Sequence, residues 1–269
     1  MEVTAAGIWS SVERIRRESP VIHNITNYVV MNSTANALLA IGASPVMAHA
    51  EEEVEDMVGI ASALVVNIGT LSKKWVKAMR KAAARARKRG IPVVLDPVGA
   101  GATRYRTETA RGLIEESTPA IIRGNASEIM ALLDRSGGTK GVDSTAASSD
   151  ALAAARALSE RSGSVVCVSG ETDYIVSGQD EARIRNGHSM MPRVTGLGCT
   201  ASALCGAFAA VQNTPALAAA QAMAVMGIAG EIAAAQAAGP GSLQVAFLDA
   251  LCRLTEADIV QRLKAEGWS

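Results

Sequence analysis

The chain has 269 residues, with 26 lysine plus arginine side chains against 26 aspartate plus glutamate, so its formal net charge is +0. This length suits one large α/β domain or two small ones, and the balanced charge gives no reason to expect nucleic acid or an anionic membrane as a partner. Hydrophobic residues make up 49% of the sequence but aromatic residues only 3%, which predicts a finely packed aliphatic core.

Short apolar runs alternate with helical segments along the chain. The expected strands are residues 64–66, 92–95, 120–122 and 165–168. The expected helices are residues 8–17, 29–40, 71–89, 107–116, 126–133, 149–161, 199–211, 215–237 and 243–266. Short, continuous apolar strands are typical of a parallel sheet covered by helices on both faces.

The order of these elements predicts an α/β fold with three layers, α/β/α, around a mostly parallel central sheet. We find no internal repeat and no linker long enough to divide the chain, so we expect one domain over residues 1–269. The glycine-rich residues 135–144 are expected to form the most flexible loop.

Two helical segments have a second interpretation, which the sequence disfavours. Residues 71–89 are rich in lysine and arginine, but these charges fall on one helical face without interleaved aromatic residues, as on a solvated outer helix. Residues 216–235 are nearly long enough to span a membrane, but they are mostly alanine, and Glu231 would be costly in lipid. We expect a buried helix there and no membrane partner.

The cysteines favour a reducing setting. Cys167, Cys199, Cys205 and Cys252 show no CxxC spacing and no histidine-rich neighbourhood, so a structural zinc site is not expected. The N-terminal residues lack the apolar core of a secretory signal. We therefore expect a cytoplasmic protein.

Polar residues follow the expected strands at once, and ligands bind beyond the carboxyl ends of parallel strands. Asp96 ends one strand, and Glu128 lies three residues after Asn125, at the start of a helix. Carboxylates at such an edge hold Mg²⁺ directly or through its waters. The alternative is structural: Glu128 as a first-turn acid with Asn125 as N-cap, and Asp96 as an ordinary turn residue before proline.

Two further residues at this edge suit phosphate recognition. The guanidinium of Arg123 offers planar, two-pronged hydrogen bonds, and Ser169 offers a hydroxyl and a neighbouring amide at a strand end. Each residue also has a structural interpretation, and its local sequence does not decide between them.

The turn Thr195–Cys199 carries the strongest local signal. Its glycines let the backbone point its N–H groups one way, and a long small-residue helix begins directly after them. The helix N-terminus adds partial positive charge, so the turn predicts an anion site able to stabilise a phosphoryl group in transit. It also predicts a lowered pKa for Cys199, which would make the thiol a proton acceptor. The alternative is a plain glycine turn with Cys199 as a small buried residue.

Motifs of other nucleotide enzymes are absent from the sequence. There is no GxxxxGK[ST] P-loop and no protein-kinase signature. The three histidines have no metal-ligand spacing.

Taken together, the motifs resemble the hydroxyethylthiazole kinase family, ribokinase-like enzymes of thiamine synthesis and salvage. The resemblance runs from about Ile15 to Leu251. The segments that carry it are Val21–Val29, Gly42–Ala48, Asp96–Thr103, Arg123–Ile129 and Thr195–Cys199.

The resemblance implies transfer of the ATP γ-phosphoryl group to the hydroxyethyl oxygen of 4-methyl-5-(2-hydroxyethyl)thiazole, with Mg²⁺. It also implies a homotrimer with the thiazole pocket near subunit interfaces. The implied roles are Met47, Asn24 and Gly196 for the thiazole, Arg123 and Ser169 for ATP, Asp96 and Glu128 for the metal, and Gly198 and Cys199 for the anion hole. For Met47 the sequence by itself favours a core position, because methionine fills irregular gaps.

Cysteine at position 199 separates this family from most ribokinase-like enzymes, which carry an aspartate base there. It argues against sugar kinases and against the rival within the same fold, hydroxymethylpyrimidine kinase. A rival of another class is a nucleotide-binding regulatory protein without catalysis, against which the intact acids and glycine turn argue.

Overall fold

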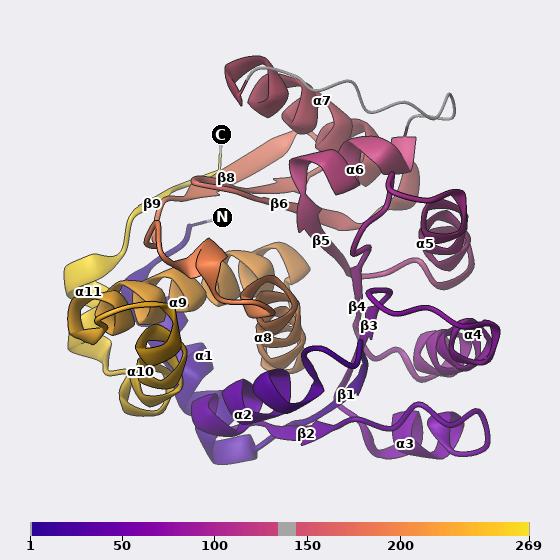
Figure 1. Cartoon of the computed structure of the whole chain (residues 1–269), viewed down its shortest axis with the longest axis horizontal. Helices are drawn as coiled ribbons and strands as arrows, with labels where there is room; N and C mark the ends of the chain where they lie inside the picture. The colour runs from indigo at the N-terminus through magenta and orange to yellow at the C-terminus, as the bar shows by residue number, and fades with distance from the viewer. Residues whose placement is uncertain (1, 134–143, 269) are drawn as a thin grey trace.

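The computed structural model describes residues 2–133 and 144–268, so most of the loop expected over 135–144 lies outside the described residues. Figure 1 shows the elements in chain order. The helices are α1 (Ala5–Glu18), α2 (Met31–Ile41), α3 (Val54–Ile60), α4 (Lys73–Arg89), α5 (Arg104–Ser117), α6 (Ala126–Leu133), α7 (Ser144–Ser162), the 3₁₀ turn η1 (Met191–Arg193), α8 (Leu197–Val211), α9 (Pro215–Gln236), α10 (Pro240–Arg253) and α11 (Glu256–Arg262). The strands are β1 (Val21–Ile25), β2 (Ser44–Val46), β3 (Ala63–Asn67), β4 (Val93–Asp96), β5 (Ile121–Asn125), β6 (Val165–Ser169), β7 (Asp173–Ser177), β8 (Asp180–Ile184) and β9 (Ala265–Glu266).

One mixed sheet forms the centre of the molecule. Over the described residues its strand order is β2-β1-β3-β4-β5-β6-β7-β8-β9. Neighbours from β2 to β6 pair in parallel, and neighbours from β6 to β9 pair antiparallel. The expected mostly parallel sheet is confirmed, and each of the four expected strands is present in it.

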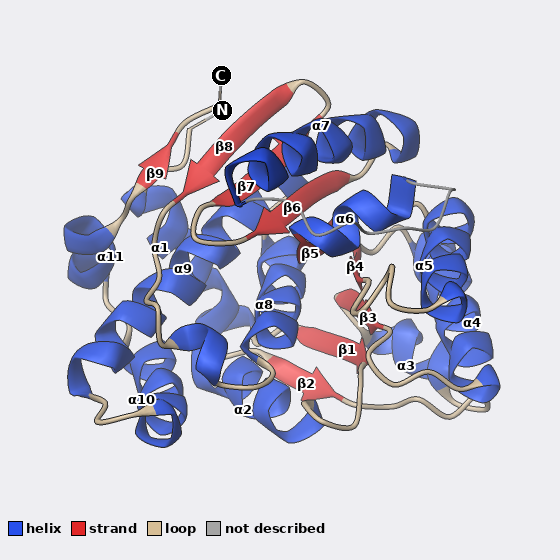
Figure 2. Ribbon diagram, turned by 45° about the horizontal axis from the view of Figure 1, so that its top comes forward, coloured by secondary structure: helices blue, strands red, loops and turns tan. Residues whose placement is uncertain are grey.

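Helices cover both faces of this sheet, which confirms the three layers (Figures 1 and 2). On one face α1, α2 and α8–α11 share a core with the side chains of Val65 and Val94. On the other face α3–α7 pack over Leu64, Val66 and Leu95. Successive residues of β3 and β4 thus point to opposite faces and both are buried, as in a sheet covered on both sides.

The helix α9 is long and apolar enough to cross a membrane by length and composition. In the structure 83% of the most apolar 18-residue stretch of α9 is buried, and the helix packs against α8, α10 and the sheet. The expectation of a buried helix over residues 215–237 is confirmed, because the interior of the protein occupies the surface that lipid would take.

The helix expected over residues 243–266 is wrong. The chain leaves the helical conformation at Leu254, where ψ is 130°, and Thr255 starts α11 through a capping box with Asp258. Residues 265–266 then add the edge strand β9 beside β8. The apolar pattern continues across the break, so the cap residues rather than periodicity divide the two helices.

Several elements were not expected from the sequence. The strand β1 contains the polar residues His23 and Asn24, which interrupt its apolar run, yet both side chains are buried. In the hairpin β7–β8, the charged residues Glu181 and Arg183 interrupt β8, and β7 has only a three-residue apolar run between Asp173 and Ser177. The edge strands β2 and β9 and the helix α3 are too short to produce a clear pattern.

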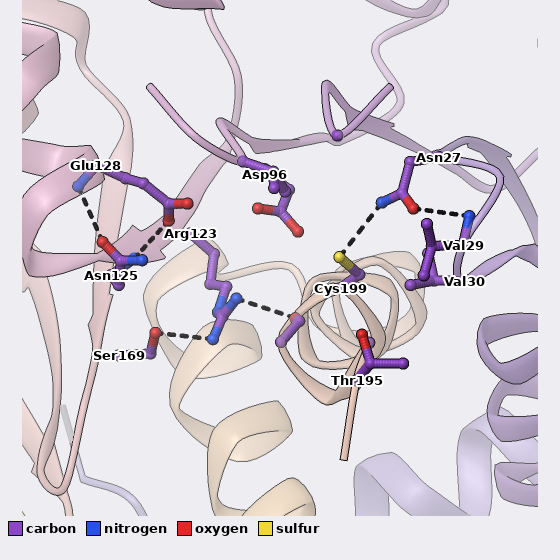
Figure 3. Close-up of a pocket in the computed structure, with 14 residues that line it drawn as sticks. Asn27, Val29, Val30, Asp96, Arg123, Asn125, Glu128, Ser169, Thr195 and Cys199 are labelled. Carbon is purple, nitrogen blue, oxygen red and sulfur yellow. Dashed lines mark hydrogen bonds between the residues drawn. The ribbon is translucent and has the colours of Figure 1, made fainter. Parts of the chain in front are cut away.

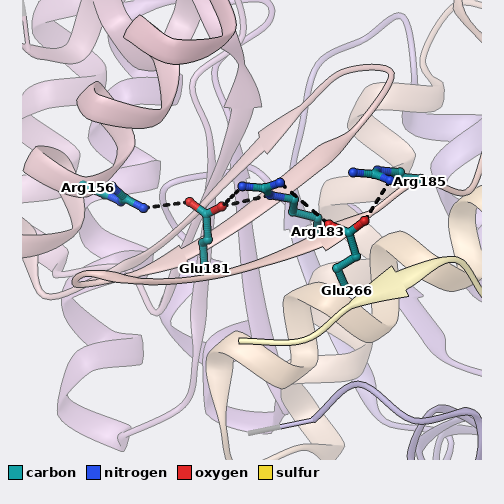
Figure 4. Close-up of polar contacts among 5 residues, drawn as sticks. All are labelled: Arg156, Glu181, Arg183, Arg185 and Glu266. Carbon is teal, nitrogen blue, oxygen red and sulfur yellow. Dashed lines mark hydrogen bonds and ion pairs between the residues drawn. The ribbon is translucent and has the colours of Figure 1, made fainter. Parts of the chain in front are cut away.

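An ionic network ties the antiparallel edge of the sheet together (Figure 4). Glu181 has a side chain only 3% exposed and lies between Arg156 of α7 and Arg183 of β8, at 2.9 and 2.5 Å. Glu266 of β9 pairs with Arg185 at 2.8 Å and lies 3.7 Å from Arg183. The last described strand is therefore fixed to β8 by charge as well as by its ladder.

Helix α8 lies unusually close to the sheet because it is built from small residues. A Cβ atom at Gly206 would come within 2.6 Å of a methyl group of Val65 and 3.3 Å of one from Ile22. This close approach brings the N-terminus of α8 to the carboxyl ends of the strands.

We predict that Gly206→Ala destabilises the fold, because the added methyl pushes α8 off β1 and β3. Overpacking of this kind costs about 1–3 kcal/mol, measurable as a lower midpoint in urea unfolding. The matched control is Gly59→Ala in α3, where no other atom of the described residues lies within 4 Å of the added Cβ, its chain neighbours and the helix backbone apart. That change should stabilise by up to about 1 kcal/mol through lower unfolded-state entropy. Equal midpoints for the two variants would contradict the close approach.

Candidate active site

A cavity of about 420 Å³ lies where the parallel strands end and α8 begins. The sheet register places the polar strand ends side by side, with Asn67 beside Asp96 and Asn125 beside Ser169. The lining residues are Asn27, Val29, Val30, Gly69, Asp96, Val98, Arg123, Asn125, Glu128, Ser169, Thr195, Gly196, Gly198 and Cys199.

The glycine turn forms the floor of this cavity. Gly196 is the N-cap of α8 with φ of 84°, and a Cβ there would lie 2.7 Å from a methyl group of Val30. Both the backbone conformation and the space therefore require glycine. Among the described residues no side chain caps this helix, so its first N–H groups are left for an anion, in the field of the helix N-terminus. The geometry supports the predicted anion site.

Arg123 joins three elements at the side of the cavity (Figure 3). Its Nη1 donates to the carbonyl of Gly198 at 3.0 Å, and its Nη2 donates to Oγ of Ser169 at 2.7 Å. Burial opposes its charge, but Asp96 acts together with Cys167, Asp173 and Cys205 to hold the pKa of Arg123 above its ordinary value. The guanidinium is therefore charged and fixed beside the glycine turn.

Asp96 lies deep in the cavity with one oxygen already satisfied. Its Oδ2 accepts hydrogen bonds from Nδ2 of Asn67 at 2.7 Å and from Oγ of Ser202 at 2.8 Å. Burial raises the pKa of Asp96 to about 7; Arg123 lowers it and the charge of Glu128 raises it further. A cation near Oδ1 would stabilise the ionised form of Asp96 and so lower this pKa.

Glu128 holds the second carboxylate against the backbone. Its Oε2 accepts from the backbone N–H of Asn125 at 2.9 Å, and its own N–H donates to Oδ1 of Asn125 at 2.9 Å. Its Oε1 accepts from the N–H of Gly99 at 2.8 Å. The capping interpretation of Glu128 is therefore correct, and the same side chain still lines the cavity with lone pairs to spare.

The expected lowering of the Cys199 pKa is wrong. Burial and the nearby Asp96 carboxylate raise the pKa of Cys199 to about 11, and they outweigh hydrogen bonds from Asn67 and Asn27 and the charge of Arg123. Nδ2 of Asn27 lies 3.5 Å from Sγ (Figure 3). At neutral pH the residue is thus a thiol, because desolvation and a neighbouring anion exceed the effect of the helix terminus.

A second, larger cavity of about 980 Å³ adjoins the first. The two share Arg123, Asn125, Ser169, Thr195, Gly196 and Gly198. The larger one runs past the β6–β7 turn to the loop after β8 and to α9, where Met191, Met223 and Met226 line it. Together they form one long groove with the glycine turn at the junction.

The structure brings seven of the nine residues named from the sequence to this cavity: Asp96, Arg123, Glu128, Ser169, Gly196, Gly198 and Cys199. Asn24 and Met47 do not line it. Asn24 is buried, donating to the carbonyl of Ile22, and Met47 directly follows β2, which pairs with β1.

The sequence-based list missed Asn27, Asn67 and Ser202. Asn67 is bonded to Asp96, and Nδ2 of Asn27 donates to Oδ1 of Asn67 at 2.9 Å, so these side chains hold the carboxylate and the thiol in one network. Asn67 could have been found from its place at a strand end, whereas Ser202 lies inside a helix and gives no sequence signal.

Residues 12–257 match the model of the hydroxyethylthiazole kinase family. The chain is 65% identical over 265 residues to the hydroxyethylthiazole kinase of Syntrophus aciditrophicus, covering 98% of each chain. It is also similar to the structure of hydroxyethylthiazole kinase from Pyrococcus horikoshii, with a TM-score of 0.90, 43% identity and coverage of 97% of this chain and 99% of that one. Pyridoxal kinase from Staphylococcus aureus shares the fold, with a TM-score of 0.60, 15% identity and coverage of 78% of this chain and 87% of that one.

We predict that Asp96 makes the ligand-free protein less stable at high pH. Its folded-state pKa of about 7 lies above the ordinary 3.8, so between these values the folded state holds a proton that the unfolded state has lost. Stability from this group is thus complete below pH 4 and is lost as the pH rises through 7. Between pH 5 and pH 8 the loss amounts to about 2–3 kcal/mol.

Urea unfolding without nucleotide or divalent cation tests this. Asp96→Asn should lose less stability than the wild type between pH 5 and pH 8, whereas the exposed control Asp180→Asn should follow the wild type. A parallel pH dependence of Asp96→Asn and wild type would show that the carboxylate is ionised throughout.

Proposed function

The chain belongs to the hydroxyethylthiazole kinase family, and we propose that its phosphoryl-transfer site is the cavity around the turn Thr195–Cys199. The enzyme is a kinase that phosphorylates the hydroxyethyl group of the thiazole for thiamine biosynthesis or salvage. The observation that carries the placement is the uncapped N-terminus of α8 beside Arg123 and the two carboxylates Asp96 and Glu128.

Arg123 and Ser169 bind the phosphates of ATP in this proposal. The guanidinium already donates to Ser169 and to the Gly198 carbonyl, so its remaining N–H donors are aimed by those bonds rather than free to rotate. A charged planar donor beside a helix N-terminus suits the developing charge on the transferred group.

A divalent cation accompanies ATP in kinases, and we propose that it is Mg²⁺ held near Asp96 and Glu128. No group of three or more His, Cys, Asp or Glu residues suited to a metal occurs within residues 2–133 and 144–268. Two carboxylates fit Mg²⁺, which keeps several waters and binds through one or two carboxylates plus substrate phosphates. The raised pKa of Asp96 indicates negative charge that the surrounding protein leaves partly uncompensated. When bound, the ion neutralises charge on the phosphate oxygens.

The thiazole is proposed to lie between Gly196 and Met47, with Asn24 nearby. Asn24 is the residue after His23, which pairs with Val46, so Asn24 and Met47 lie at the carboxyl ends of neighbouring strands. The Oδ1 atom of Asn24 is buried without a hydrogen-bond partner among the described residues. Val29 and Val30 line the phosphate cavity on the same side and can hold the hydroxyethyl arm toward it.

The chemical step relies on position and charge. The hydroxyl oxygen attacks the γ-phosphorus as the bond to the β-phosphate oxygen breaks, and the loose transition state requires little early loss of the hydroxyl proton. Because the pKa of Cys199 is about 11, little thiolate is present at neutral pH to act as a base. In this proposal Gly198 and Cys199 contribute their backbone N–H groups, and the thiol packs against the substrate.

We propose that residues 1–269 act as one kinase domain that assembles into a cytoplasmic homotrimer. Tyr28 is 65% exposed and Val29 66% exposed, although both adjoin the cavity residue Asn27. Apolar side chains at the rim of a pocket are typical of a surface that another protein copy covers. This supports a thiazole pocket near the subunit interface.

Coupled ADP release tests the function directly. Wild-type enzyme with ATP and Mg²⁺ should release ADP when 4-methyl-5-(2-hydroxyethyl)thiazole is added, and much less with hydroxymethylpyrimidine or pyridoxal. Nucleotide binding without ADP formation on any of these alcohols would indicate a non-catalytic protein instead.

We predict that Cys199→Ala lowers kcat less than about 10-fold, because the thiol does not act as a strong base. Gly198→Val should lower kcat by more than about 100-fold, because a Cβ there lies 3.1 Å from Nη1 of Arg123 and fills the anion site. The backbone at Gly198 has no positive φ, so the valine is tolerated by the chain itself. A cysteine variant that loses far more activity than the glycine variant would assign the base to Cys199.

We predict that Tyr28→Glu breaks the homotrimer and raises the KM for the thiazole, because a carboxylate cannot be buried against a second copy. The matched control is Val260→Glu on α11, where the valine is 66% exposed and lines neither cavity. Native mass spectrometry gives the subunit number. A wild-type monomer, or a trimer that survives Tyr28→Glu, would rule out this surface as the interface.

A further inference from the structure

The larger cavity continues from the phosphate-binding residues, so it offers the space for the nucleoside part of ATP. It shares Arg123, Ser169 and Gly198 with the smaller cavity and ends among the methionines of η1 and α9. This placement rests on the proposed function. What the cavity recognises in the nucleoside then depends on the polar groups that line it between these two ends.

Asp173 is the more buried of the two acidic residues in that lining, the other being Glu171. Asp173 begins β7 and is only 6% exposed. The β6–β7 ladder pairs Val168 with Tyr174, so the next rung places Asp173 across from Ser169. Its backbone position is therefore one strand spacing, roughly 4.8 Å, from the proposed phosphate-contacting residue.

One of its carboxylate oxygens is unpaired. Oδ1 accepts from the backbone N–H of Gly170 at 3.0 Å, which shapes the turn after Ser169. Among the described residues Asp173 makes no other hydrogen bond and no ion pair. The described side-chain atoms that are both shut off from solvent and without a hydrogen-bond partner do not include Oδ2. This oxygen is therefore accessible to a molecule in the cavity.

A buried carboxylate with a free oxygen is built to accept hydrogen bonds. Burial raises the pKa of Asp173 to about 6, so at pH 8 the group is ionised and acts only as an acceptor. Leaving such a group without donors costs free energy, and a ligand that brings hydroxyl donors recovers it.

The position of Asp173 indicates that the hydroxyl donors come from the ribose and not from the base. In a nucleotide the sugar follows the α-phosphate directly and the base lies beyond it. Asp173 stands across from Ser169, at the phosphate end of the cavity, whereas the apolar residues Met223 and Met226 lie on α9 and suit the flat face of a base. Carboxylate recognition of ribose hydroxyls is a general solution in nucleotide-binding proteins.

We propose that Asp173 accepts hydrogen bonds from the ribose hydroxyls of the nucleotide, so that the enzyme distinguishes ribonucleotides from their deoxy analogues. The oxygen bonded to Gly170 fixes the carboxylate, and the other oxygen faces the sugar. Asp173 is thus a specificity residue beside the transfer machinery, with no part in the chemical step.

The test compares ATP with 2′-deoxy-ATP and 3′-deoxy-ATP as phosphoryl donors for the thiazole. For the wild type, kcat/KM should fall about 10- to 100-fold for at least one deoxy analogue, because the missing hydroxyl leaves the carboxylate unpaired. For Asp173→Asn this ratio should shrink at least about fivefold, since the amide oxygen keeps the Gly170 bond while its NH₂ cannot accept a hydroxyl proton. Asp180→Asn, at an exposed position of β8 that lines neither cavity, should keep the wild-type ratio.

Two results would overturn the inference. A wild type that uses the deoxy analogues as well as ATP excludes the contact whether or not any variant folds. An Asp173→Asn enzyme that loses activity equally with all three donors assigns the residue to shaping the Gly170 turn. Competition binding of ADP, 2′-deoxy-ADP and 3′-deoxy-ADP gives the same comparison without the thiazole, so absence of thiazole phosphorylation would contradict the proposed function and leave this test intact.

Discussion

The buried guanidinium of Arg123 is the interaction on which the site depends. It originates in β5, donates to Ser169 at the end of β6, and donates to the Gly198 carbonyl in the first turn of α8. Its Nε is sealed and unpaired, and burial opposes its charge, so the position is costly unless anions lie nearby. The carboxylates of Asp96 and Asp173 act on it from within the protein, and a nucleotide phosphate would add a further anion. The fold thus buries a positive charge that is fully compensated only when the substrate phosphates bind.

This constraint also sets the protonation states around it. Burial raises the pKa of Asp96 to about 7 and that of Cys199 to about 11, with Asp96 adding to the effect on the thiol. The site therefore offers one fixed guanidinium and the N–H dipoles of the glycine turn, and among the described residues it lacks a strong base. For a reaction whose transition state gathers negative charge on phosphoryl oxygens, that is the more useful arrangement.

Much of this architecture can be read from the sequence, and the failures have physical causes. Continuous apolar runs predicted β3 to β6, and polar strand ends predicted Asp96, Arg123 and Ser169, because a parallel sheet brings its carboxyl ends together. The broken pattern of β1 hid a strand whose polar side chains are buried. The pKa of Cys199 was mispredicted because a helix terminus is visible in sequence, whereas burial and the distance to Asp96 are tertiary properties.

We infer that a fixed, two-pronged cation at position 123 organises phosphoryl transfer. Steady-state kinetics of Arg123→Lys measure this most directly, because lysine keeps the charge but cannot bond Ser169 and the Gly198 carbonyl in the same planar geometry. We expect kcat/KM for ATP to fall about 100-fold in Arg123→Lys, while circular dichroism shows an intact fold. A lysine variant with near wild-type kcat/KM would contradict it, since charge alone would then suffice.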